Sequence, residues 1–230
     1  MTENFNPFLT EYHTPFETTP FHLIKTEHFE PAMEEGMKAH NRDVDAIVNN
    51  SDKPTFANTI VALEKSGALL DRVTTVFGNL LSAETSDELE VLAERMMPRL
   101  SEHSNNISLN ERLFARIKQV YDETKQGALS QEDYMLLQNT YNSFIRNGAN
   151  LTSEQKERFR QLSAELSVLT LKFSQNNLKE TNRYELLLTP EQTDGLPTSA
   201  LDAYAQAAKD KNQEGYLVTL QAPSFVPFMK

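Results

Sequence analysis

The chain has 230 residues, of which 39% are hydrophobic and 24% are charged, and its 22 Lys and Arg against 33 Asp and Glu give a formal net charge of -11. These proportions are ordinary for a globular protein, so they exclude a disordered chain, and no apolar run approaches the roughly 20 residues that cross a bilayer. The negative charge repels a phosphate backbone, and no run of basic residues offsets it. We therefore expect neither nucleic acid nor a membrane as a partner.

The compartment is only loosely bounded by the sequence. There is no cysteine, which excludes disulfides and thiolate chemistry and fits either a reducing cytosol or a periplasm. The first residues, MTENFNPFLTEYHTPFETTPF, lack the basic start and apolar core of a secretory signal. We expect a cytoplasmic protein, with the periplasm as the alternative if a signal peptide has been removed.

The first third of the chain is predicted to hold an arm and two helices. Residues 1–25 are expected to form an extended N-terminal arm, because proline recurs in them. A helix is predicted from about Glu30 to Val48, with Pro31 tolerated in its opening turn. Apolar residues at helical spacing from Ile60 to Leu80 predict the next helix, which Gly67 should weaken or bend.

Two more helices are predicted in the middle of the chain. Ser86 begins one of them, and Pro98 should kink or end it because proline removes a helical hydrogen bond. The second runs from about Asn110 to Gln126 and should stop at Gly127.

A pair of long helices follows. The first begins at Ser130 and should end at Asn147-Gly148, since glycine adopts the left-handed conformation that closes helices. The second is placed from Thr152 to Glu180, because Thr152 and Gln155 have capping-box spacing. We expect the two to pack antiparallel. Apolar residues of the second recur at steps of 3, 4, 3 and 4 and give it one apolar face: Phe159, Leu162, Leu166, Leu169 and Phe173.

The last part of the chain changes character. Short apolar runs at Tyr184–Leu188 and Tyr216–Leu220 predict two strands, and a helix from about Ser199 to Lys211 is predicted between them. Two strands alone seldom form a stable sheet, so we expect a third strand from residues outside this chain, or packing on the helices. The segment from Pro223 to Pro227 is interpreted as a chain exit.

The predicted fold class is therefore mainly α, with an antiparallel array of long helices and a small C-terminal β/α unit of two short strands. We divide the chain into an arm at 1–25, a helical array at 26–181 and a strand-helix-strand unit at 182–230. No internal repeat, low-complexity tract or Gly/Ser linker interrupts this order.

Few groups in this pattern point to chemistry. His28, His40 and His103 have carboxylates nearby, but neighbours one or two positions apart on a helix point to different faces, so we predict structural or surface roles for them. Glu34-Glu35 and Asp43/Asp45 could in principle supply a carboxylate pair for acid-base work. A solvated helix face is the simpler interpretation of both.

Seven blocks of sequence occur in a fixed order: Asn6–Leu9, His28–Ala32, Pro54–Leu70, Leu109–Arg116, Phe144–Leu151, Phe173–Asn176 and Leu217–Phe228. They resemble the N-terminal region of the zinc metallopeptidases that include the peptidyl-dipeptidases (dipeptidyl carboxypeptidases), oligopeptidase A, thimet oligopeptidase and neurolysin. The bacterial peptidyl-dipeptidases match best. The blocks correspond to well under half of such an enzyme.

The resemblance implies a neurolysin-like helical region that forms one wall of a narrow substrate channel. Members of the family hold zinc with a His-Glu-x-x-His helix, in which two imidazoles share one face beside the general-base Glu. None of the five His in this chain is followed by Glu. We therefore predict no catalytic, cofactor-binding or metal-binding residue here and no activity of this chain alone, and we expect the chain to end before the catalytic helix.

The predicted function belongs to the parent enzyme: zinc-dependent cleavage of short peptides, with release of C-terminal dipeptides. Its expected partners are those peptides and the C-terminal catalytic part of the same protein. The alternative is a free-standing helical binding or scaffold protein without peptidase activity, because the chain begins with Met and has a globular composition.

Overall fold

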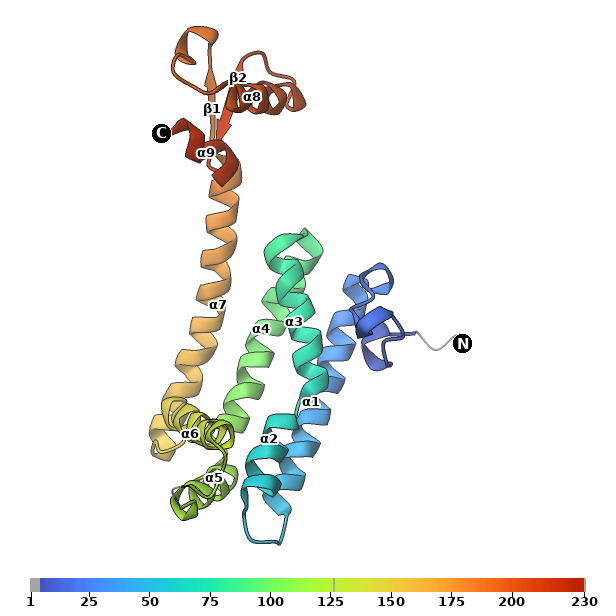
Figure 1. The fold of residues 1–230 in the computed structure, drawn as a ribbon, viewed down its shortest axis with the longest axis vertical. Coiled ribbons are helices and arrows are strands. Elements are labelled where there is room, and N and C mark those ends of the chain that lie inside the picture. Colours follow the sequence, from blue (N-terminus) through green and yellow to red (C-terminus); the bar gives the residue numbers. More distant parts are fainter. Residues whose placement is uncertain (1–4, 126, 230) are drawn as a thin grey trace. The chain divides into compact units, whose positions relative to one another are not determined.

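The computed structural model describes residues 5–125 and 127–229. These residues are mainly α-helical and include one two-stranded antiparallel sheet near the C-terminus (Figure 1). The predicted fold class is confirmed. Two compact units, Met1–Val168 and Leu169–Lys230, divide the chain inside helix α7. The domain limits placed at residues 25 and 181 stay predictions.

In the first unit and the helix that continues from it, the elements are η1 Pro7–Leu9, η2 Pro15–Glu17, η3 Phe21–Leu23, α1 Thr26–Asn49, the π-helical η4 Phe56–Val61, α2 Ala62–Lys65, α3 Ala68–Ala83, α4 Asp87–Ser108, α5 Glu111–Glu123, α6 Gln131–Arg146 and α7 Ser153–Arg183. In the second unit they are β1 Glu185–Leu188, η5 Pro190–Gln192, α8 Thr198–Asp210, β2 Tyr216–Thr219 and α9 Ala222–Phe228.

The N-terminal segment packs against the helices. Residues 5–25, expected to be extended, contain the short 3-10 turns η1 to η3. Phe8 is fully buried, with its ring 5.0 Å from that of Phe29 in α1, and Phe29 lies 5.2 Å from Phe77 in α3. A row of three aromatic rings thus joins this segment to α1 and α3. Residues 1–4 of the predicted arm lie outside the described residues.

Helix α1 begins at Thr26, four residues before the predicted start at Glu30. The Lys25 N–H donates a hydrogen bond to Nδ1 of His28 at 3.1 Å, which satisfies an amide at the start of the helix. Pro31 consequently lies inside the helix and not in its opening turn. The prediction overlooked this cap because histidine is not among the usual capping residues.

The predicted continuous helix from Ile60 to Leu80 is interrupted. Helix α2 ends at Lys65 and α3 begins at Ala68, and between them Gly67 has a φ of 72°. A left-handed residue cannot continue a right-handed helix, so Gly67 breaks the helix instead of bending it.

Helix α4 begins after Ser86 as predicted, and the Oγ of Ser86 accepts the N–H of Leu89 at 3.3 Å. The helix runs through Pro98 to Ser108, so the expectation that Pro98 could end it is wrong. The missing hydrogen bond is a local cost, and burial of apolar residues such as Met96 on the same helix offsets it.

Helices α5 and α6 follow the predicted pattern with one shorter end. Helix α5 ends at Glu123, where the Thr124 hydroxyl donates to the Val120 carbonyl at 2.6 Å; Gln126, its predicted end, lies outside the described residues. Helix α6 ends before Asn147, and Gly148 has a φ of 87°, as predicted. One buried cluster of the unit joins α1, η4, α5 and α6: Val44, Ile47, Val48, Ile60, Leu113, Ile117, Val120, Leu137, Phe144 and Ala149.

Helix α7 has the predicted capping box but not the predicted packing. The Thr152 N–H donates to Gln155 Oε1 at 3.0 Å, and the Gln155 N–H donates to Thr152 Oγ1 at 3.3 Å. Its apolar face stays open to solvent, with Leu166 63% exposed and Phe173 74% exposed. Helix α6 packs on α5 and η4 instead, because its own buried residues face them. The α6 helix, expected as the antiparallel partner of α7, thus does not cover the apolar face of α7.

The second unit is a two-stranded sheet covered by a helix. Strands β1 and β2 are antiparallel, with Glu185 opposite Thr219 and Leu188 opposite Tyr216. Tyr204 of α8 is buried on the sheet. Within residues 169–229 no third strand is present, and packing on α8 buries the sheet instead.

The end of the described chain is helical. The segment from Pro223 to Pro227, predicted as a chain exit, lies in α9. Pro223 occupies the first turn, where its missing N–H costs no hydrogen bond. The Tyr204 hydroxyl donates to the Ser224 carbonyl at 2.7 Å and ties α9 to α8, which explains why the segment folds back.

Candidate functional site

Two histidines that are distant in sequence meet between α1 and α4. Nδ1 of His40 lies 3.1 Å from Nε2 of His103, and the rings are edge to face with their centroids 5.1 Å apart. His103 is buried and His40 is half-buried. One nitrogen must donate and the other accept, so the neutral rings carry the same tautomer, both protonated at Nδ1 or both at Nε2.

The backbone at Gly67 holds the ring of His40 in place. A Cβ at position 67 would lie 2.8 Å from Nδ1 of His40, closer than real contacts allow, so only glycine leaves room for the ring. The Gly67 N–H donates to the Asp43 carboxylate at 3.3 Å, which fixes the turn against α1. The break between α2 and α3 therefore positions the histidine pair.

A cleft of about 950 Å³ opens beside the pair. Burial lowers the pKa of His40, and the nearby Asp43 carboxylate raises it in part. Burial also lowers the pKa of His103, and His40 lowers it further. Burial, which lowers the pKa of both rings, therefore favours their neutral forms. The walls come from several helices and include His40, Asp71, Thr74, His103, Ser104 and Ser143.

A second groove, of about 1130 Å³, lies between the starts of α1 and α4 and has several carboxylates. Arg95 pairs with Glu30 at 2.7 Å, and Arg99 pairs with Glu34 at 2.7 Å. The hydrogen bond from Arg99 lowers the pKa of Glu34. A general acid at neutral pH needs a raised pKa, so Glu34 is an ion-paired carboxylate and not such an acid.

The other groups considered from sequence are dispersed. His28 caps α1, Glu35 pairs with Arg42 at 3.0 Å, and Asp45 is exposed. In the part of the chain that the structure describes, no three His, Cys, Asp or Glu residues come together as a metal site. A catalytic zinc takes three protein ligands, so the two imidazoles of the pair do not fit one.

Sequence reasoning did not bring His40 and His103 together, although a signal was present. His40 lies seven residues after Met33, and His103 lies seven residues after Met96. Both methionines are fully buried, and a spacing of seven returns to nearly the same helix face. Each histidine thus follows the buried face of its helix. The sequence of each helix does not indicate which other helix its buried face contacts.

Among residues 5–125 and 127–229, no helix is long and apolar enough to cross a bilayer.

Comparison with known proteins shows that the chain is similar to a part of several peptidases. No protein-family model matches the sequence. Dipeptidyl carboxypeptidase from Salmonella typhimurium is 36% identical over 91% of this chain and 31% of its own length. The Escherichia coli dipeptidyl carboxypeptidase is 35% identical over 90% and 30%. Oligopeptidase A from E. coli is 31% identical over 97% and 32%. The chain is a homologue of these peptidases.

The resemblance that the seven blocks indicated is therefore confirmed, and dipeptidyl carboxypeptidases and oligopeptidase A are among the relatives found. The chain spans less than a third of the length of these peptidases. It corresponds to a segment of each.

Proposed function

We propose that this chain is the non-catalytic N-terminal part of a zinc metallopeptidase that cleaves short peptides and removes C-terminal dipeptides. The observation that carries the proposal is its similarity to dipeptidyl carboxypeptidases over nine-tenths of its length but under a third of theirs. In the proposal the zinc and its ligands belong to the remaining part, and this chain forms a wall of the substrate channel. The cytoplasm is the proposed compartment.

The open face of α7 supports the proposal that a catalytic part packs against this chain. Lys156 is the only buried residue recorded along the helix. Leucine and phenylalanine recur along one side of α7 and are largely exposed. A helix with an uncovered apolar stripe is a usual docking surface for another helix. The catalytic part of the same protein is the partner we propose for it.

Sequencing the gene beyond the Lys230 codon tests the proposal directly. A reading frame that continues into a His-Glu-x-x-His helix is the expected result. An in-frame stop after Lys230 would contradict it and favour a free-standing helical binding protein.

The proposed division of labour is tested by activity. We expect the purified chain with added zinc to release no dipeptide from a short blocked peptide, while the longer gene product releases dipeptides and loses this activity with a zinc chelator. Dipeptide release by the 230-residue chain, above a no-protein control, would overturn the non-catalytic assignment.

The proposed docking face is tested in the longer gene product. Leu166→Asp should lower activity and stability there, because a carboxylate would enter an apolar interface. Gln161→Asp is the matched control, since Gln161 is exposed and lies roughly on the opposite side of α7. Equal effects of the two substitutions would argue against docking through this face.

A further inference from the structure

The His40–His103 pair connects two helices whose packing builds the first unit. Helix α1 packs against both α3 and α4, and the pair is a direct polar contact between α1 and α4. It depends on a single hydrogen bond between two ring nitrogens 3.1 Å apart. That bond needs one nitrogen without a proton, so it exists only while at least one of the rings is neutral.

The first and the second extra proton that the pair binds have different consequences for its hydrogen bond. A pair that holds one extra proton keeps its hydrogen bond, because a neutral nitrogen still accepts. When both rings are protonated, two N–H groups and two positive charges face each other across 3.1 Å, and the bond is lost. The two rings therefore titrate as a coupled pair.

On the side that faces Gly67, the His40 ring has little room for the movement that could relieve this repulsion. Gly67 approaches the His40 ring so closely that even a methyl group would collide with it. Among the described residues, the ionisable groups that line the cleft or act on His40 are Asp43 on α1, Glu64 and Lys65 on α2, and Asp71 on α3. Glu102 and Arg99 of α4 lie one and four residues before His103 in sequence. The cleft residues contributed by α6, and those of α4 besides His103, are uncharged.

The nearby carboxylates favour charged histidine rings, but they do not cancel the preference of the pair for the neutral form. Asp43 favours a charged His40, yet burial has the larger effect on that ring. His103 is more buried than His40, and the effects on it, burial and the neighbouring ring, both disfavour charge. The balance therefore favours the neutral, hydrogen-bonded pair near pH 7.

We propose that the His40–His103 pair is a pH-sensitive clasp, which strengthens the contact between α1 and α4 while at least one ring is neutral and weakens it when both rings are protonated. The ion pairs of Arg95 and Arg99 with α1 do not depend on the clasp. Its release would loosen the cleft beside the pair. The proposal does not depend on the peptidase assignment, because it concerns only contacts inside the first unit.

The sign of the pH dependence follows from linkage. The unfolded chain takes up protons at both histidines near their ordinary pKa of about 6.5, whereas the folded pair resists them. Stability from the clasp is therefore complete above this pH and is lost as the pH falls below it. Each proton bound more strongly by the unfolded chain raises the unfolding equilibrium constant by up to about tenfold per pH unit, so two give at most about hundredfold.

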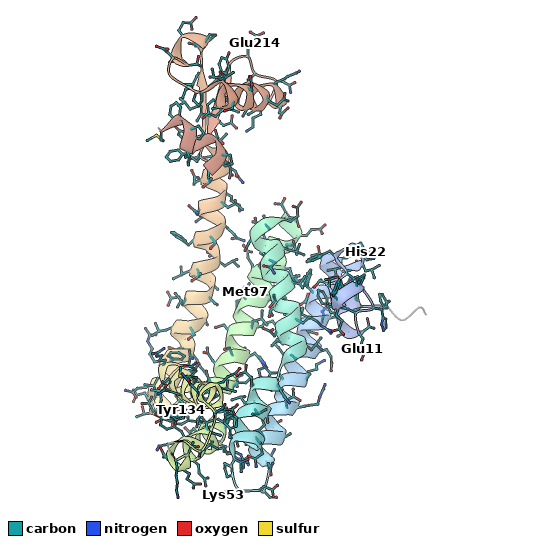
Figure 2. The ribbon with its side chains drawn as sticks, viewed as in Figure 1. Glu11, His22, Lys53, Met97, Tyr134 and Glu214 are labelled. Atoms are coloured by element: carbon teal, nitrogen blue, oxygen red, sulfur yellow. The ribbon has the colours of Figure 1, made fainter. Side chains whose placement is uncertain are left out.

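The first test compares urea unfolding of the 230-residue chain from pH 7.5 to 5.0 with that of the double variant His40→Asn/His103→Gln. Asn and Gln place amide groups near the positions of Nδ1 and Nε2 but do not titrate. We expect the double variant to lose most of the rise in the unfolding constant. The control is His22→Gln, because His22 is exposed on the N-terminal segment, as Figure 2 shows, and should keep the wild-type profile. The same pH profile in wild type and double variant would overturn the proposal.

The second test needs no variant, so it holds even if the double variant fails to fold. Nitrogen-15 NMR of the imidazole rings should show His40 and His103 in the same tautomer at pH 7.5 and a coupled titration in two steps. Amide signals of α1 and α4 should shift with the second step. Opposite tautomers, or two independent titrations without any change in α1 and α4, would refute the clasp.

Discussion

At the scale of single residues, the local structure around Gly67 depends on how closely its backbone approaches the imidazole ring of His40. Its positive φ ends one helix and starts another, and its missing Cβ makes room for His40. Gly36 acts in a similar way, because a Cβ there would lie 2.9 Å from the Cα of Leu70 and push α1 away from α3. Both glycines are needed for space, and Gly67 is also needed for conformation.

We predict that Gly67→Ala destabilises the chain by about 1–3 kcal/mol, because alanine is strained at positive φ and its methyl group would meet the His40 ring. Urea unfolding measures the change. Gly78→Ala is the control: Gly78 lies inside α3 with no atom within 4 Å of an added Cβ, so this substitution should be neutral or stabilise by up to about 1 kcal/mol. A Gly67→Ala chain as stable as the Gly78→Ala chain would show that the close approach is not real.

At the scale of elements, the helices of the first unit differ in how much of their apolar surface they bury. Helix α6 buries Leu137 fully, whereas Leu166 of α7 is 63% exposed. Periodicity is equally regular in both helices, so it does not tell which face is covered. The near end of α7 is instead tied to α5 by Lys156, whose Nζ lies 2.8 Å from Glu111 Oε1.

We predict that Leu137→Ala costs about 2–5 kcal/mol in unfolding free energy, since it leaves a cavity in a packed cluster. Leu166→Ala, the same change on an exposed face, should cost less than about 0.5 kcal/mol in this chain. Urea unfolding of both variants measures the difference. Similar costs would mean that the α7 face is buried in solution.

A further prediction concerns acid stability. The hydrogen bond from Lys156 lowers the pKa of Glu111 below its ordinary 4.5. A carboxylate with a lowered pKa stabilises the fold above the unfolded pKa, and this contribution is lost as the pH falls through the folded pKa. Glu111→Gln should therefore weaken the chain at pH 6 and flatten its loss of stability below about pH 4.5. Glu157→Gln, a nearby exposed position on α7, should keep the wild-type acid dependence, and thermal unfolding between pH 6 and 3 distinguishes the two.

At the scale of the whole molecule, the net negative charge limits which partners the chain can bind. A net charge of -11 on 230 residues makes the chain repel other polyanions. Two arginines of α4, Arg95 and Arg99, are paired with carboxylates of α1 and do not form a basic surface there.

We therefore predict that the chain does not bind duplex DNA measurably, even at low salt, where electrostatic binding is strongest. Fluorescence anisotropy of a labelled duplex with up to about 100 μM protein checks this. A salt-dependent rise in anisotropy would reveal a basic surface and contradict the prediction.

The limits of prediction from sequence can be located in particular residues. The start of α4 at Ser86 and that of α7 after Thr152 were predicted correctly, because caps depend on residues within four positions of each other. The start of α1 was missed because its cap uses His28. The break at Gly67 was underestimated because its cause includes His40, which is distant in sequence.

The sequence by itself determined the helical class, several element limits and the relation to peptidases, because these depend on local spacing and on residues read in order. Only the tertiary structure decided that His40 meets His103, that α6 leaves the apolar face of α7 open, and that the chain folds back into α9. The physical reason is that a helix records which of its faces is apolar, but the choice of partner for that face depends on shape and charge over the whole molecule.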